Sequence, residues 1–141
     1  MTTTLSRRAL LAAGAILAAP APLRAQGSMR LLVIGGGFGG ASAASFARRA
    51  YPDVQVTLVE PQPRFVTCPY GNLLLGGERQ IGQITHSYDG LRARGVSVVQ
   101  DRAVGLDPVA RRVRLGGGAS VEYDRLILSP GIALRWNAIE V

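Results

Sequence analysis

The sequence has a single cysteine, Cys68, and no lysine among its 141 residues. One cysteine cannot form a disulfide within its own chain, which excludes a small disulfide-stapled domain. No cluster with metal-ligand spacing is visible, nor any Ser-His-Asp set or pair of carboxylates suited to acid–base catalysis. The apolar run over residues 9–19 is shorter than the roughly 20 residues that cross a bilayer core, so we expect no transmembrane segment.

The first 25 residues have the composition of an export signal. Arg7 and Arg8 precede the apolar run, and Leu23-Arg24-Ala25 follows it as a cleavage site. A positive start, a short apolar stretch and a small residue before the cut are typical of a signal peptide, and the paired arginines favour the twin-arginine route. An ordinary secretory signal and a buried amphipathic helix are the alternatives. We therefore predict a signal peptide over 1–25 and a periplasmic protein.

Charge and composition describe the remaining chain as one globular domain. Apolar residues make up 48% of the sequence, which argues against wholesale disorder, and the length suits a single domain. The net charge of +7 suggests a nucleic-acid partner, but removing Arg7, Arg8 and Arg24 lowers it to +4. We therefore expect no nucleic-acid partner.

A strand, a glycine-rich turn and a helix follow the signal. The apolar run Arg30–Ile34 predicts a buried parallel strand, which enters residues 35–40 with the sequence GGGFGG. Residues 41–49 predict a helix, and a second strand over 54–59 ends at Glu60, 20 residues after Gly40. The G-x-G-x-x-G pattern is weak alone, but with strand, helix and acid at these spacings it predicts a dinucleotide site. A glycine-rich turn in an unrelated sheet is the alternative.

Each part of this fingerprint has a mechanical reason. Gly35 permits the tight turn, Gly37 lets the backbone approach a pyrophosphate, and Gly40 lets helix and strand pack closely. Free N–H groups and the helix dipole favour the diphosphate there, and we include Phe38, in this turn, among the cofactor-binding residues. Glu60 can accept hydrogen bonds from ribose hydroxyls and would repel a 2′-phosphate, which favours FAD or NAD over NADP.

The later elements predict an α/β fold with a small antiparallel meander. The Pro-rich stretch over 61–72 is unsuited to a helix or central strand. We predict a helix from Ile84 to Arg94, a strand over 96–99, a meander over 102–122, and a strand from Tyr123 that leads into Ser129-Pro130-Gly131. His86 then lies at a helix start, where a solvent-facing or packing role outweighs catalysis.

This order of elements resembles the FAD domain of the two-dinucleotide-domain flavoproteins. The resemblance implies that Gly131 sits beside the flavin's diphosphate and that backbone near Ala103 and Val104 lines the adenine pocket. In that fold the last flavin-contacting strand returns only after an inserted second nucleotide domain. We therefore expect residues 26–141 to be the N-terminal part of a Rossmann-like FAD-binding domain, and incomplete.

The region around Cys68 resembles a narrower family. Residues 67–72 (TCPYGN), 75–77 and 86–95 (HSYDGLRARG) resemble the flavoprotein subunit of flavocytochrome c sulfide dehydrogenase, and the resemblance runs from Arg30 to Gly131. It implies that Cys68 carries FAD through a thioether to the flavin's 8α-methyl carbon. A disulfide with residues beyond the sequence and a free structural cysteine are the alternatives. Arg64 is a candidate for the diphosphate or for Glu60, with a surface role equally open.

The family resemblance also implies a function. It predicts an FAD oxidoreductase that oxidises sulfide and passes electrons to a c-type cytochrome subunit. Because Cys68 is the only cysteine, the redox-active cysteine pair of that family is absent here and is expected downstream, leaving no catalytic residue in this chain. A sulfide:quinone or NADH:quinone reductase, and a non-catalytic nucleotide-binding fragment, are the alternatives. Trp136 could cover flavin or core.

Overall fold

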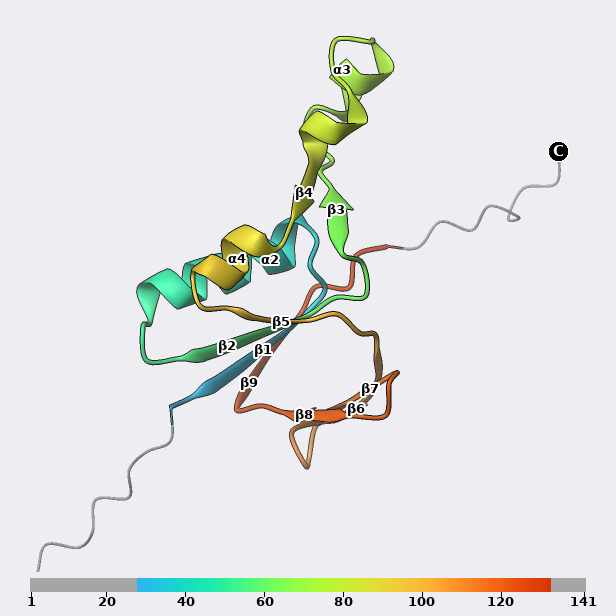
Figure 1. Ribbon diagram of the computed structural model, residues 1–141. Helices are drawn as coiled ribbons and strands as arrows, with labels where there is room; N and C mark the ends of the chain where they lie inside the picture. The colour runs from blue at the N-terminus through green and yellow to red at the C-terminus, as the bar shows by residue number, and fades with distance from the viewer. Residues whose placement is uncertain (1–27, 133–141) are drawn as a thin grey trace, which may run out of the picture.

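The computed structural model describes residues 28–132, so the predicted signal peptide and Trp136 lie outside the described part. Its centre is a four-stranded parallel sheet with the order β5-β2-β1-β9 (Figure 1). The strands are β1 (Arg30–Ile34), β2 (Gln55–Val59), β5 (Ser97–Val99) and β9 (Arg125–Leu128). All of their carboxyl ends therefore meet at one edge of the sheet.

Helices cover one face of this sheet and a second sheet covers the other (Figure 1). Helix α2 (Phe38–Ala50) and the short α4 (Asp89–Ala93) pack on the first face, where Val33 and Leu58 are fully buried. On the second face, Leu32 and Val59 pack against the antiparallel strands β6 (Ala103–Asp107), β7 (Arg112–Leu115) and β8 (Ser120–Glu122). Because successive strand residues point to opposite faces, burial on both explains why β1 and β2 are apolar.

The α/β class and the antiparallel meander predicted from the sequence are confirmed. Strand β7 alternates exposed Arg112 and Arg114 with buried Val113 and Leu115, so the arginines form a solvated face. No helix within residues 28–132 is long and apolar enough to cross a membrane.

A two-stranded ribbon projects from the carboxyl edge of the central sheet (Figure 1). It pairs β3 (Arg64–Val66) with β4 (Thr85–Ser87) and carries α3 (Gly71–Leu75) and the 3₁₀ turn η1 (Ile81–Ile84) at its tip. Across the ribbon, the Thr67 N–H donates to the Ile84 carbonyl at 2.8 Å.

The predicted helix from Ile84 to Arg94 is wrong, since only Asp89–Ala93 is α-helical. Buried Ile84, Tyr88 and Leu91 have helical spacing, but residues 85–87 pair with a strand about 20 positions earlier in the chain. His86 consequently lies exposed on β4 rather than at a helix start.

Candidate dinucleotide-binding site

A cavity of about 550 Å³ opens at the carboxyl edge of the parallel sheet. The chain leaves β1 for β2 and β5 on one side and returns to β9 on the other, which makes this edge the topological switch point where open α/β sheets bind ligands. Residues that follow the strand ends line the cavity: Ile34, Gly35, Val59, Glu60, Pro61, Gln62, Arg102, Ala103, Pro130, Gly131 and Ile132.

Gly35 makes the turn that leaves β1. Its φ of 98° lies in the left-handed region, and its N–H donates to the Val59 carbonyl at 2.9 Å. A Cβ added at Gly35 would lie 2.0 Å from the Ser129 carbonyl oxygen, because β9 ends directly beside the turn. The turn therefore packs backbone against backbone, and only glycine fits.

Gly40 and Gly37 differ in the space around them. A Cβ added at Gly40 would lie 1.8 Å from the Gly35 carbonyl oxygen, so this residue lets α2 approach β1 closely. A Cβ added at Gly37 would meet no atom within 4 Å, since this exposed residue faces open space. Gly37 therefore leaves the backbone at the start of α2 open to a ligand.

The start of α2 presents backbone donors to that open side. The Ala41 N–H donates to the Gly37 carbonyl at 2.9 Å, so the N–H groups of Gly37, Phe38 and Gly39 precede the helix's own hydrogen bonds. The first turn contains no acidic side chain, and the N-cap residue makes no side-chain cap bond. Free N–H groups with the positive end of the dipole suit a diphosphate.

Glu60 follows β2 and lies half-buried at the cavity wall. Its Oε2 accepts the Gly36 N–H at 2.7 Å and its Oε1 accepts the Gln62 N–H at 2.9 Å. These two bonds orient the carboxylate, and each oxygen keeps a further acceptor position for a ribose hydroxyl. Gln62 was not predicted from the sequence, although its place three residues after the end of β2 was a usable signal.

The structure brings only some of the predicted residues together. Gly35, Glu60 and Gly131 share the cavity, and Gly131 has a φ of 75°. Ala103 lines the cavity as well, whereas Val104 is 49% exposed and is not among the lining residues. The wall at β6 is therefore built from Ala103 and Arg102 rather than from Val104.

Phe38, Arg64 and Cys68 lie outside this cavity. Phe38 is 64% exposed and lines two adjoining hollows of about 410 and 310 Å³, together with Thr67 and His86 of the ribbon. Arg64 is exposed on β3, and Cys68 is an exposed free thiol on the ribbon. Arg64 and Cys68 thus belong to the projecting ribbon, while Glu60 and Gly131 belong to the sheet edge.

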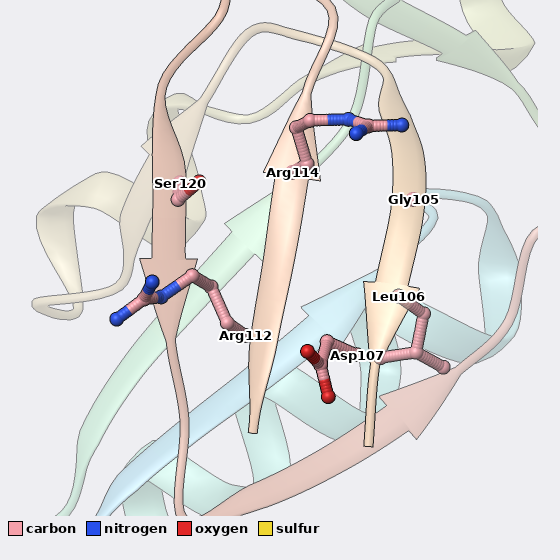
Figure 2. A pocket seen from close by; sticks show the side chains of 6 residues that line it. All are labelled: Gly105, Leu106, Asp107, Arg112, Arg114 and Ser120. Atoms are coloured by element: carbon pink, nitrogen blue, oxygen red, sulfur yellow. The ribbon is translucent and has the colours of Figure 1, made fainter. Parts of the chain in front are cut away.

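A separate hollow of about 290 Å³ lies on the solvent face of β6, β7 and β8 (Figure 2). Figure 2 shows Arg114 extended over Gly105, with Arg112 pointing toward β8. Arg112 pairs with Glu122 at 2.9 Å, and Arg30 pairs with the same carboxylate at 2.9 Å. The two arginines, Arg30 more than Arg112, lower the pKa of Glu122. None of the predicted site residues lines this hollow.

The residues at the sheet edge fit the adenosine diphosphate half of an FAD. An open approach at Gly37, unused donors at the start of α2 and a carboxylate with spare acceptor positions are what that half requires. No group of three His, Cys, Asp or Glu residues placed to hold a metal ion occurs within residues 28–132.

A parallel sheet with this turn, helix and acid at its carboxyl edge defines a dinucleotide-binding domain of the Rossmann type. Residues 29–140 match the family described as pyridine nucleotide-disulphide oxidoreductase. The chain belongs to this family.

Curated relatives include enzymes of sulfide oxidation. The flavoprotein chain of flavocytochrome c sulfide dehydrogenase from Chlorobaculum thiosulfatiphilum is 56% identical over 46 residues, which is 33% of this chain and 96% of that sequence. The mitochondrial sulfide:quinone oxidoreductase of Mus musculus is 30% identical over 116 residues, covering 82% of this chain and 26% of the mouse protein. This chain therefore spans about a quarter of the mouse enzyme.

Solved structures agree on the fold. The sulfide:quinone oxidoreductase of Aquifex aeolicus superposes with a TM-score of 0.72 at 31% identity, covering 78% of this chain and 26% of that one. The water-forming NADH oxidase of Lactobacillus brevis superposes with a TM-score of 0.65 at 25% identity, covering 77% of this chain and 27% of the oxidase. The expected resemblance to a sulfide dehydrogenase flavoprotein and to FAD/NAD-binding oxidoreductases is confirmed.

Proposed function

We propose that this chain supplies the FAD-binding part of an oxidoreductase that oxidises sulfide. The observation that carries the proposal is the cavity at the carboxyl edge, where Gly35, Glu60 and Gly131 meet beside the open start of α2. The N–H groups of Gly37 and Phe38 would hold the diphosphate, and Glu60 would hold the ribose. Bound FAD supplies the electron-transfer chemistry, and the protein supplies position and electrostatics.

The choice of sulfide as substrate rests on the relatives. A flavocytochrome c sulfide dehydrogenase chain and sulfide:quinone oxidoreductases both match this chain, so sulfide oxidation is shared by the two groups. Because Cys68 is the one cysteine, we propose that the cysteine pair reacting with sulfide lies in residues beyond this sequence.

Cys68 is the proposed attachment point of the flavin. Its thiol is exposed on a ribbon that projects from the same sheet edge as the cavity, and an exposed thiol is a liability in an oxidising compartment (Figure 1). A thioether from Sγ to the 8α-methyl carbon would replace the S–H bond and one methyl C–H bond, and the oxidised flavin itself would accept the two electrons released. The bond would remove that liability and retain the cofactor outside the cytoplasm. Export through a twin-arginine signal would allow the flavin to be loaded before the protein leaves the cytoplasm.

Acid precipitation of the full-length protein tests the thioether. For the parent protein, we expect the flavin colour in the acid-precipitated pellet. For the Cys68→Ala variant, we expect the colour in the supernatant. A Cys68→Ala pellet as yellow as the parent's, or a colourless parent pellet, contradicts the attachment.

The proposed electron acceptor is a c-type cytochrome subunit, as the name of the Chlorobaculum relative suggests. A quinone is the second candidate, because the relatives that align over 77–82% of this chain are sulfide:quinone enzymes. Sulfide-dependent reduction by the purified full-length protein separates the two: we expect reduction of cytochrome c, and reduction of quinone alone would favour the second candidate.

A further inference from the structure

Tyr88 is a buried tyrosine that contacts the glycine turn. Only 2% of it is exposed, and its ring packs among Val33, Leu58 and Leu91 in the core between the sheet and the helices. Its hydroxyl donates to the Gly36 carbonyl oxygen at 3.0 Å. Burial first, and then the charge of Glu60, raise the pKa of Tyr88 to about 12, so the hydroxyl keeps its proton at neutral pH.

The Gly36 carbonyl shares its peptide group with the N–H of Gly37. This peptide is planar and trans, so its C=O and N–H point to opposite sides. With the carbonyl held by the buried Tyr88 hydroxyl, the trans peptide directs the Gly37 N–H away from that hydroxyl. A Cβ added at Gly37 would meet no atom within 4 Å, so the residue itself leaves room for a ligand. The N–H of Gly36 is held in turn by Glu60 at 2.7 Å. Two side chains thus hold the peptides on both sides of Gly36.

The chain around Tyr88 is built to hold it in place. Its carbonyl accepts the N–H groups of Leu91 and Arg92, each at 3.0 Å, at the start of α4. Asp89 accepts a hydrogen bond from the Ser87 hydroxyl at 2.8 Å and one from the Arg92 guanidinium at 3.1 Å. Both bonds lower the pKa of Asp89, and the bond from Ser87 has the larger effect. The Tyr-Asp-Gly-Leu-Arg segment therefore makes a braced turn whose buried end is the tyrosine ring.

The same ring contacts the ribbon that carries Cys68. Phe65 of β3 stacks on Tyr88 with ring centroids 5.7 Å apart and planes inclined by 22°. A Cβ added at Gly36 would lie 2.5 Å from the Tyr88 hydroxyl oxygen, so the turn and the ring leave no space between them. Tyr88 is thus in contact with the glycine turn on one side and the base of the ribbon on the other.

We propose that Tyr88 is a positioning residue for the dinucleotide: its hydroxyl holds the Gly36–Gly37 peptide so that the Gly37 N–H faces the diphosphate. This inference rests on the proposed binding of FAD. It assigns a binding role to a residue of the Tyr-Asp-Gly-Leu-Arg segment that lies outside the cavity.

The test compares Tyr88→Phe with Tyr123→Phe, the other buried tyrosine, which packs on the opposite face of the sheet. Full-length protein is used in a Cys68→Ser background, so that FAD exchanges reversibly. The readouts are the Kd of FAD and of ADP for the apoprotein, with the melting temperature of each apoprotein as the measure of folding. We expect Tyr88→Phe to raise both Kd values about three- to tenfold, because one hydrogen bond no longer orders the turn. Tyr123→Phe should leave the Kd of FAD and the Kd of ADP within twofold of the parent's values.

The possible outcomes separate this inference from the proposed function. If the parent binds FAD and Tyr88→Phe changes Kd less than threefold, or no more than Tyr123→Phe does, the positioning role is overturned while FAD binding stands. A parent that binds neither FAD nor ADP overturns the proposed function and this inference with it. If Tyr88→Phe does not fold, a crystal structure of the parent with ADP replaces it. The Gly37 N–H on the diphosphate, with the Tyr88 hydroxyl still on the Gly36 carbonyl, supports the role. A diphosphate that does not contact the Gly37 N–H overturns it.

Discussion

Two glycines three residues apart should respond to alanine in opposite ways. At Gly40, the added Cβ would lie 1.8 Å from the Gly35 carbonyl oxygen and 3.0 Å from the Gly35 carbonyl carbon, where ordinary contact begins at 3.4 Å. Because the obstacle is backbone, α2 must move away from β1. Overpacking of this kind costs about 3 kcal/mol, so Gly40→Ala should destabilise the fold strongly.

At Gly37 the same substitution meets no atom within 4 Å, and the backbone is extended there, with φ −66° and ψ −169°. Gly37→Ala should change the free energy of unfolding by less than about 0.5 kcal/mol. The methyl group would instead occupy the approach to the N–H groups at the start of α2. Losing one hydrogen bond to a charged diphosphate weakens binding by about 1.5–3 kcal/mol, or roughly 10- to 100-fold.

Thermal melting of the apoprotein and FAD titration by flavin fluorescence measure the two effects on the full-length protein. Gly82→Ala is the matched control, because a Cβ there also meets no atom within 4 Å and the residue lies in η1, away from the cavity lining. A melting temperature of Gly40→Ala equal to the parent's would rule out the backbone clash at Gly40. An FAD affinity of Gly37→Ala equal to that of Gly82→Ala would rule out a ligand approach at Gly37.

Three further substitutions test the site and its electrostatics. Glu60→Gln should weaken FAD binding about tenfold in fluorescence titration, since a charged acceptor for the ribose is lost; unchanged affinity would remove Glu60 from the site. Tyr88 has its pKa raised from 10.0 to about 12, so its stabilising contribution is complete below pH about 10 and is lost as pH rises toward 12. Between those pH values the melting temperature of Tyr88→Phe should therefore fall less than that of the parent. An equal fall in both proteins would count against the buried hydroxyl. Arg30 lowers the pKa of Asp124, so that pair stabilises the fold above the ordinary Asp pKa of about 4 and the stabilisation is lost as pH falls. Asp124→Asn should make the melting temperature depend less on pH at acid pH. An unchanged pH dependence would contradict a stabilising Arg30–Asp124 pair.

The glycine turn and both of its strands were predictable because their signals are local. A run of apolar residues, a G-x-G-x-x-G turn and an acid 20 residues after Gly40 occupy one stretch of sequence, and residues 30–60 fold as that pattern indicates. The meander was equally accessible, since Val113 and Leu115 alternate with exposed arginines between two clear turns.

The ribbon was not predictable, because its strands are defined by a partner elsewhere in the chain. Thr85–Ser87 becomes a strand only by pairing with Arg64–Val66, whereas the spacing of Ile84, Tyr88 and Leu91 alone indicates a helix. The contact between Tyr88 and Gly36 joins residues 52 positions apart, and no local pattern encodes it.

A crystal structure of the full-length protein with its flavin would show where FAD binds. We expect the diphosphate within hydrogen-bond distance of the Gly37 and Phe38 N–H groups, and the adenosine ribose on the Glu60 carboxylate. A dinucleotide bound away from the cavity of Gly35, Glu60 and Gly131 would contradict this expectation.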